Sequence, residues 1–325
     1  MDPHSKALRT GSAAIACAIV FRLAALWPVQ VHTAPVPSET ETGRDVRFSA
    51  SREVFWEWES AAPLLPAQAA PEEPVLPAFS PEDAVLTEMY YACSLRPDLE
   101  ALLSLPLSWN LADTEPRVLI LHTHTTESYT QRKEPYVESA DYRTLDESYN
   151  MLSIGSIVAG ILSDNGIGVV HDRQLHDYPS YNGSYNDARK SILSYLEQFP
   201  GIELVLDLHR DAADTENGQL RPLVTVAGEA VAQLMLVMGT DESGLSHEHW
   251  QKNLSLALKL QAQLERQAPG ITRPTILRAQ RFNQDLSPGA LLVEVGAAGN
   301  THMEARRAAE QLANAIVALA KGTVG

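Results

Sequence analysis

Cysteine is nearly absent from this 325-residue chain, which contains only Cys17 and Cys93. Two cysteines cannot build a disulfide framework or a cysteine-ligated zinc site. Any metal ion that the chain binds must therefore be held by histidine and carboxylate side chains.

Basic residues are also few, with 25 Lys and Arg against 41 Asp and Glu, and the formal net charge is −16. The acidic residues are spread along the whole length, which argues against a protein that neutralises a nucleic-acid backbone and favours a simple role in solubility. No internal repeat is evident, so solenoid folds are excluded. With 45% hydrophobic residues, the chain can still bury a sizeable core.

A long apolar run near the N-terminus predicts a membrane anchor. Residues 1–10 include His4, Lys6 and Arg9, and residues 11–31 are mostly apolar, which is about the length that a spanning helix requires. Arg22 lies within the run at a cost of roughly 2.5 to 3.5 kcal/mol, so the span could be shifted or shorter, and a cleaved signal peptide is the alternative. Both readings place the rest of the chain outside the cytoplasm, because the basic residues precede the run.

Three further segments follow the predicted anchor. Residues 32–79 are rich in proline, alanine and acidic residues and predict a linker. Residues 80–114 are expected to be a helical lead-in, since Ser80 and Pro81 are typical of a helix start and precede a predicted helix at 84–95. Residues 115–325 form the predicted catalytic domain.

Within that domain, apolar runs alternate with amphipathic stretches. This alternation indicates an α/β fold with a mainly parallel sheet and helices on both of its faces. The expected strands are at 118–121, 167–170, 202–208, 223–226, 233–238, 275–277 and 291–295, and the expected helices at 149–163, 186–199, 247–267 and 303–320.

Polar side chains stand at the ends of three of these strands. The first strand runs into His122, His124 and Glu127, the strand at 202–208 delivers His209, and the strand at 291–295 contains Glu294 near its end. In open α/β sheets, ligand sites form beyond the carboxyl ends of parallel strands. One such residue is weak evidence of a site, but three together predict an active site at this edge.

The residue types fit a zinc hydrolase, which keeps three protein ligands and an open fourth position. We expect His124, Glu127 and His209 to be the ligands, and Glu294 to be the general base. His122 alternates with His124 along the strand, so a structural position behind the site is expected for it. Arg210 is a candidate for binding a substrate carboxylate or stabilising an oxyanion, and a local ion pair with Asp211 is the alternative.

Several motifs resemble the stage II sporulation protein P family. They are His122-Thr-His-Thr-Thr-Glu-Ser-Tyr129, His176-Asp-Tyr-Pro-Ser-Tyr-Asn182, Asp207-Leu-His-Arg-Asp-Ala212, Gly239-Thr240 followed by residues 250–256, Asn283-Gln-Asp-Leu-Ser-Pro-Gly289, Leu292-Val-Glu-Val-Gly296 and Asn300-Thr301. The resemblance covers about residue 117 to the C-terminus as well as the layout of anchor and linker.

The resemblance implies an amidase-like fold and a septal and engulfment peptidoglycan hydrolase of spore-forming bacteria, related to zinc N-acetylmuramoyl-L-alanine amidases. It also implies cleavage of peptide cross-links and a complex with sporulation proteins D and M. His124, His209 and Glu294 match residues of the amidase site. The acidic ligand stays open, because amidases take it from the start of the first long helix, where this chain has Asp146 and Glu147, whereas Glu127 matches a His-x-x-Glu arrangement.

Two other functions are compatible with these residues. A carboxypeptidase-like zinc peptidase would need a basic pocket for a terminal carboxylate, for which Arg210, Arg278 and Arg281 are candidates. A non-catalytic peptidoglycan scaffold is the other, although a scaffold has no reason to keep four polar groups at strand ends. We expect a single-pass membrane protein with an extracytoplasmic catalytic domain.

Overall fold

The computed structural model describes residues 79–322, except 108, 112, 131–141 and 216–217. The predicted tail, the anchor at 11–31 and nearly all of the linker lie outside the described residues. Among the residues that are described, no helix is both long enough and apolar enough to cross a membrane.

Seven strands form one sheet in the order β1-β10-β9-β11-β4-β2-β3. Every neighbouring pair is parallel except β9 and β11. The expected mainly parallel sheet is therefore confirmed. The strands are β1 (Met89–Ala92), β2 (Pro116–Leu121), β3 (Gly168–His171), β4 (Leu204–Asp211), β9 (Leu234–Gly239), β10 (Thr275–Arg278) and β11 (Ala290–Ala297).

Because β9 opposes β11, the sheet consists of two halves that run in opposite directions. Strands β11, β4, β2 and β3 end at one edge, and β1, β10 and β9 end at the other. Two small antiparallel hairpins are added outside the sheet: β5 (Asp214–Thr215) with β6 (Gly218–Gln219), and β7 (Leu223–Val226) with β8 (Glu229–Ala232).

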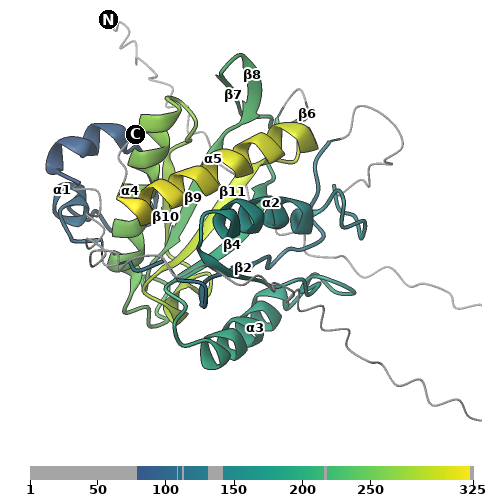
Figure 1. Ribbon diagram of the computed structural model, residues 1–325, viewed down its shortest axis with the longest axis horizontal. Helices are drawn as coiled ribbons and strands as arrows, with labels where there is room; N and C mark the ends of the chain where they lie inside the picture. The colour runs from purple at the N-terminus through teal and green to yellow at the C-terminus, as the bar shows by residue number, and fades with distance from the viewer. Residues whose placement is uncertain (1–78, 108, 112, 131–141, 216–217, 323–325) are drawn as a thin grey trace, which may run out of the picture. The chain divides into compact units, whose positions relative to one another are not determined.

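Helices pack on both faces of the sheet, as expected (Figure 1). The main core lies between the sheet and α2, α4 and α5, and a smaller one lies under α3. The helices are η1 (Pro81–Leu86), α1 (Leu99–Leu103), α2 (Met151–Asp164), α3 (Ser184–Gln198), α4 (Trp250–Gln267), η2 (Gln284–Leu286) and α5 (His302–Lys321).

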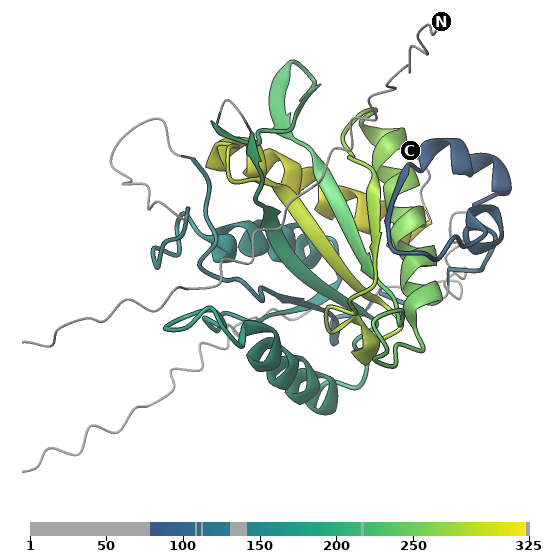
Figure 2. The same cartoon turned by 180° about the vertical axis from the view of Figure 1, so that it is seen from behind.

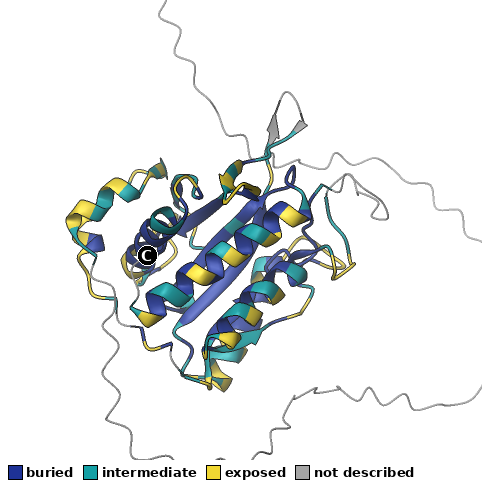
Figure 3. Ribbon diagram, turned by 45° about the horizontal axis from the view of Figure 1, so that its top comes forward, coloured by how far each residue is buried: buried dark blue, intermediate teal, exposed yellow. Residues whose placement is uncertain are grey.

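The longest helix, α5, shows why these segments are helical. A capping box of Thr301 and Glu304 starts it, and Gly322, with a left-handed φ of 69°, ends it. Its alanines and leucines form one buried stripe facing the sheet, and exposed positions lie on the opposite side of the helix (Figure 3).

The face that carries α3 is only partly covered. Figure 2 shows α3 lying over the β4, β2 and β3 side, while no described helix crosses β9 and β10 on this face. Side chains alternate between the two faces of a strand, so Asp207, His209 and Glu294 lie on the face of the sheet that packs against α3. The site therefore borders the edge of the α3 layer.

The predicted helix at 84–95 is wrong. Residues 81–86 form a short 3-10 helix, and residues 89–92 form the edge strand β1, parallel to β10. The start signals were real, since Ser80 and Asp83 form a capping box. Pairing with β10, however, takes Met89, Tyr90 and Tyr91 out of the helix, so residues 80–114 contain the edge strand β1 between the short helices η1 and α1.

Candidate active site

Three parallel strands bring the predicted site residues to one edge of the sheet. Leu121 at the end of β2 is opposite Asp207 of β4, and His209 of β4 is opposite Glu294 of β11. Strands β4 and β11 continue beyond these two residues, so His209 and Glu294 lie within their strands and not after them. The pairing register between β11 and β4 shifts between Glu294 and Ala297. Gly296 lies in this interval and has a left-handed φ of 71°.

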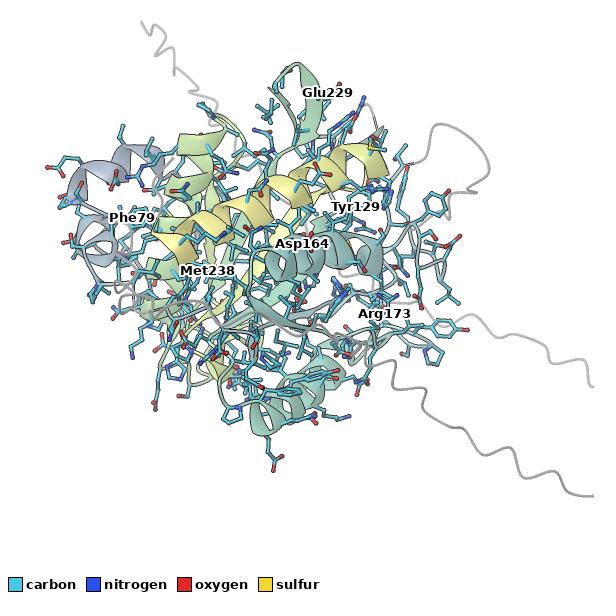
Figure 4. All side chains as sticks on the ribbon, viewed as in Figure 1. Phe79, Tyr129, Asp164, Arg173, Glu229 and Met238 are labelled. Atoms are coloured by element: carbon cyan, nitrogen blue, oxygen red, sulfur yellow. The ribbon has the colours of Figure 1, made fainter. Side chains whose placement is uncertain are left out.

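Hydrogen bonds to β4 and β11 fix the segment that follows β2. Thr123 donates from its backbone N and its Oγ1 to Asp207, at 2.8 and 2.6 Å. Tyr129, labelled in Figure 4 near the start of α2 and α5, donates from its hydroxyl to the Val295 carbonyl at 2.8 Å. These bonds hold residues 123–129 against β4 and β11.

His209 lies between two carboxylates. Its Nε2 is 2.9 Å from Asp207 Oδ1, and its Nδ1 is 3.7 Å from Glu127 Oε2. Burial lowers the pKa of His209, but the charges of Asp207 and Glu127 outweigh burial and raise the pKa to about 9. The ring is thus oriented by Asp207, with its other nitrogen towards Glu127.

Glu127 is buried and surrounded by cations. Its Oε1 lies 3.5 Å from Arg210 Nη1 and 3.6 Å from Arg143 Nη2, and its Oε2 accepts from the Arg210 backbone N at 3.2 Å. Burial alone would raise the pKa of Glu127. Arg210, His124 and His209 lower the pKa by more than burial raises it, so the net shift is downward. Glu127 is therefore an ionised carboxylate.

His124 is a neutral imidazole, because burial lowers its pKa to about 4. Its ring stacks on Tyr181 at 4.5 Å and meets the His209 ring edge to face at 5.3 Å. The Tyr181 hydroxyl is 3.2 Å from Nε2, and Ser184 Oγ is 3.3 Å from Nδ1. A neutral imidazole has a lone pair that can bind a metal.

Glu294 differs from the other carboxylates in lacking partners. Its side chain is partly exposed, but Oε2 is inaccessible and has no hydrogen-bond partner among the described residues. Burial, with the nearby charge of Asp211, raises the pKa of Glu294 to about 8. A carboxyl oxygen with no hydrogen-bond partner among the described residues, beside His209, is suited to exchanging a proton with a bound substrate or water.

The residue types fit zinc: His124 is a neutral imidazole and Glu127 an ionised carboxylate, while His209, whose pKa is raised to about 9, would release a proton on binding the ion. Two ligands of one tetrahedral zinc lie about 3.3 Å apart for bonds of about 2 Å. His209 Nδ1 and Glu127 Oε2, at 3.7 Å, are close to that separation. Within the described part of the chain, however, no three His, Cys, Asp or Glu side chains are grouped so that they could hold a metal ion.

The alternative acidic ligands lie at the surface. Asp146 is exposed and accepts from the Ser148 backbone N at 2.9 Å, and Glu147 forms an exposed ion pair with Arg173. Glu127, in contrast, is buried beside His209.

Arg210 is buried and spans the segments around the site. Its Nε donates to the Ser128 carbonyl and its Nη2 to the Tyr142 carbonyl, both at 3.0 Å. Asp211, the alternative ion-pair partner that the sequence suggests, pairs instead with Arg273 at 2.8 Å. The two hydrogen bonds of Arg210 form a clamp that joins β4 to two loop carbonyls.

His122 lies behind the site, as its alternation with His124 predicts. Its Nδ1 is 3.0 Å from the Leu208 carbonyl, and its Nε2 is 2.9 Å from Nε2 of His171. Burial lowers its pKa to about 4, so the ring is neutral.

The sequence identifies residues 176–182 only as a family motif and predicts no role for them at the site, although they follow β3, which ends at the same edge. His176 Nδ1 donates to the His122 carbonyl at 2.9 Å, and Asp177 accepts from the Thr126 hydroxyl at 2.7 Å and from Arg143 at 2.5 Å. The rule that predicts sites at the ends of parallel strands could have found this segment, since it follows a predicted strand with two histidines and two aspartates.

A model of the family described as "Stage II sporulation protein P (SpoIIP)" matches residues 66–317, well over half of the chain. The chain belongs to this family. The stage II sporulation protein P of Bacillus subtilis (strain 168) is 24% identical over 208 residues, covering 61% of this chain. The match spans 49% of that protein, so this chain corresponds to about half of its relative's length.

Solved structures of amidases are also similar. The N-acetylmuramoyl-L-alanine amidase AmiC2 of Nostoc punctiforme is 15% identical, with a TM-score of 0.37 over 62% of this chain and 94% of its own. The CwlD amidase of Clostridioides difficile, solved with the GerS lipoprotein, is 13% identical, with a TM-score of 0.40 over 62% and 98%.

Proposed function

We propose that this protein is a zinc-dependent peptidoglycan hydrolase that cleaves the N-acetylmuramoyl-L-alanine amide and, in addition, peptide cross-links. The observation that carries the proposal is the meeting of neutral His124, ionised Glu127 and His209 beside a Glu294 oxygen that lacks a partner. Membership of the sporulation family supports a role in remodelling the cell wall during spore formation.

His124, Glu127 and His209 would hold the zinc ion. Asp207 holds His209 from behind, which is the carboxylate–histidine arrangement that orients metal ligands. When bound, zinc supplies Lewis-acid polarisation of a carbonyl group and activation of water. Ionised Glu127 adds the negative charge that such a site needs, and Arg143 and Arg210 keep it ionised.

Glu294 would act as the general base and then return the proton to the leaving amine. Its Oε2 has no competing hydrogen bond among the described residues, so a proton that it accepts is not shared with a protein group. Arg210 supports the reaction through its contact with Glu127, and a direct contact with substrate is the second role proposed for it.

The test is hydrolysis of purified peptidoglycan sacculi, with the released fragments identified by mass spectrometry. A chelator should abolish release, and added zinc should restore it. Fragments with free L-alanine amino termini indicate amidase cleavage, and fragments cut between stem peptides indicate endopeptidase cleavage. Undiminished turnover in chelator would eliminate the metal mechanism.

Zinc content separates the two candidate acidic ligands. Glu127→Ala should lose zinc together with activity, while Asp146→Ala should keep both, because Asp146 is exposed and bonded to its own loop. Loss of zinc in Asp146→Ala with zinc retained in Glu127→Ala would instead make Asp146, which lies just before α2, the acidic ligand.

No observation favours the carboxypeptidase alternative. Arg281 pairs with Asp285 at 3.2 Å, and Arg278 ends β10 at the edge opposite to the ends of β4 and β11. Activity on short free peptides but not on sacculi would support that alternative. A scaffold without catalysis would bind no zinc, which elemental analysis can measure.

We also propose that residues 11–31 anchor the protein in the membrane, with the hydrolase outside the cytoplasm, and that sporulation proteins D and M are its partners. The proposal rests on the basic residues before the apolar run and on the family. Protease added to whole protoplasts should remove the hydrolase domain, and protection would reverse the topology. Co-purification from sporulating cells tests the partners.

A further inference from the structure

Tyr185, in the first turn of α3, lies beside both histidines of the candidate site. Its ring meets the His124 ring edge to face, with the ring centroids 5.5 Å apart, and is nearly parallel to the His209 ring at 6.5 Å. The Phe282 ring contacts it at 6.0 Å. A half-buried ring with three aromatic neighbours is restricted in its orientation, so its hydroxyl is presented at a defined place in the site.

The start of α3 is also tied to the segment that leads into β11. The Tyr185 carbonyl accepts from Asn283 Nδ2 at 2.8 Å. One turn further along α3, Arg189 donates to both carboxylate oxygens of Asp285, at 2.9 and 2.8 Å. Such two-pronged contacts between arginine and a carboxylate fix orientation as well as distance. Tyr185 is therefore held relative to the strand that carries Glu294.

The hydroxyl of Tyr185 is not used by the fold. It has no hydrogen-bond partner among the described residues. The Tyr129 hydroxyl, in contrast, donates to the Val295 carbonyl at 2.8 Å. The Tyr181 hydroxyl lies 3.2 Å from His124 Nε2. A tyrosine hydroxyl in a partly buried place usually has a partner, so that of Tyr185 is available to a bound molecule.

The charges around this hydroxyl belong to the site. Burial raises the pKa of Tyr185 well above its usual value, and the carboxylates of Asp207, Glu294 and Glu127 raise it further. A tyrosine keeps its proton at neutral pH even without such a shift. Tyr185 can thus donate a hydrogen bond beside Glu294 without taking part in proton transfer.

Amide hydrolysis needs a donor of this kind. When water attacks the carbonyl carbon, negative charge develops on the carbonyl oxygen, and a hydrogen-bond donor that is already in place stabilises it. Arg210 is the other candidate, but its Nε and Nη2 donate to the carbonyls of Ser128 and Tyr142. Tyr185 offers a donor that no described residue uses.

We propose that the Tyr185 hydroxyl donates a hydrogen bond to the carbonyl oxygen of the scissile amide as negative charge develops on that oxygen. The inference rests on the proposed function and adds a catalytic residue to it. It assigns stabilisation of the carbonyl oxygen to Tyr185, and leaves proton transfer to Glu294 and support of the site to Arg210.

Tyr185→Phe tests this role, because it removes the hydroxyl and keeps the ring with its three aromatic contacts. On a soluble disaccharide-peptide, kcat should fall by roughly 100- to 1,000-fold, the usual effect of losing one such donor. KM, zinc content and melting temperature should stay at their wild-type values. Tyr90→Phe is the matched control, since Tyr90 is 50% exposed on the edge strand β1 and should change none of these quantities.

A second measurement does not depend on turnover. It is the affinity for a phosphinate analogue of the same disaccharide-peptide, in which a tetrahedral phosphorus replaces the scissile carbonyl carbon. Tyr185→Phe should bind the phosphinate more weakly by about the factor by which kcat/KM falls, because both report contacts made to the tetrahedral state. A residue that only positions the histidines through its ring would not show this change.

Three results would overturn the inference: wild-type kcat in Tyr185→Phe, loss of zinc or of thermal stability in that variant, or undiminished affinity for the phosphinate. The proposed function can fail separately. If the wild type binds the phosphinate through Tyr185 but hydrolyses nothing, the proposed function fails and the donor stands. If the wild type hydrolyses the substrate and Tyr185→Phe does so equally well, only the donor fails. A wild type that neither hydrolyses the substrate nor binds the phosphinate would refute both.

Discussion

Replacing Arg210 by lysine tests whether this residue holds the site together or acts on substrate. Lysine keeps the positive charge but loses the planar fork. In the structure the fork reaches three groups in different directions: the carbonyls of Ser128 and Tyr142 at 3.0 Å, and Glu127 at 3.5 Å. One ammonium group cannot reach all three, so we expect Arg210→Lys to lose two of these contacts.

The magnitude follows from the burial of the clamp. Hydrogen bonds to a charged group are worth about 1.5 to 3 kcal/mol each, and buried carbonyls left without a partner add to the loss. Losing two such contacts should therefore lower the free energy of unfolding of Arg210→Lys by about 3 to 6 kcal/mol. For a domain of this size the melting temperature should fall by roughly 6 to 24 °C.

Arg307→Lys is the matched control. Arg307 also contacts one carbonyl, that of Ala230 at 3.1 Å, and one carboxylate, that of Glu229 at 2.6 Å, but its side chain is 31% exposed. Its replacement should cost less than about 1 kcal/mol. Both variants are compared by urea denaturation and by hydrolysis of sacculi. An Arg210→Lys protein as stable as the control, but with a kcat at least about 100-fold lower, would refute the clamp and place Arg210 on the substrate.

Three further predictions concern the base, the layer behind the site and the response to acid. Glu294→Gln should keep its zinc while turnover falls by roughly 100- to 10,000-fold, whereas His209→Ala should lose zinc as well, as elemental analysis and sacculus assays can show. Gly155→Ala should lower the free energy of unfolding by about 1 to 3 kcal/mol, because its Cβ would lie 2.5 Å from Nε2 of the half-buried His171 and 2.6 Å from Nε2 of the buried His122. Gly160→Ala on the same helix meets nothing within 4 Å and should gain up to about 1 kcal/mol in urea titrations. Burial lowers the pKa of His247 from 6.5 to about 4, so below pH 6.5 the unfolded chain binds this proton first and stability falls with falling pH. His247→Leu should make that decline shallower by at most about 1.4 kcal/mol per pH unit between pH 6.5 and 4, and an unchanged slope in melts at several pH values would contradict the assignment.

Much of the site could be predicted because parallel strands end at a common edge. The apolar runs before His124, before His209 and around Glu294 identify β2, β4 and β11, and the three strands are neighbours in the sheet. Alternation along the strand also separated His124, beside the site, from His122, bonded to the Leu208 carbonyl behind it. These inferences need only local periodicity and one rule of topology.

Pairings between distant segments could not be predicted in the same way. Residues 89–92 carry no signal that distinguishes an edge strand from the end of a helix, and the partner that decides, β10, lies far along the chain. The antiparallel direction of β9 is equally invisible in its apolar run. Contacts such as Asp177 with Thr126 depend on how the segment after β3 folds back beneath the site.

The structure also separates two kinds of polar residue that look alike in sequence. Arg210 and Asp177 have their hydrogen bonds satisfied by loop carbonyls, a hydroxyl and other charges, so they stabilise the fold around the site. Glu294 Oε2 has no such bond among the described residues, and its burial raises the cost of ionising it. A group of the second kind contributes little to stability, which agrees with the role as general base that we propose for Glu294. Changes at Arg210 should therefore appear first in the unfolding free energy, and changes at Glu294 first in turnover.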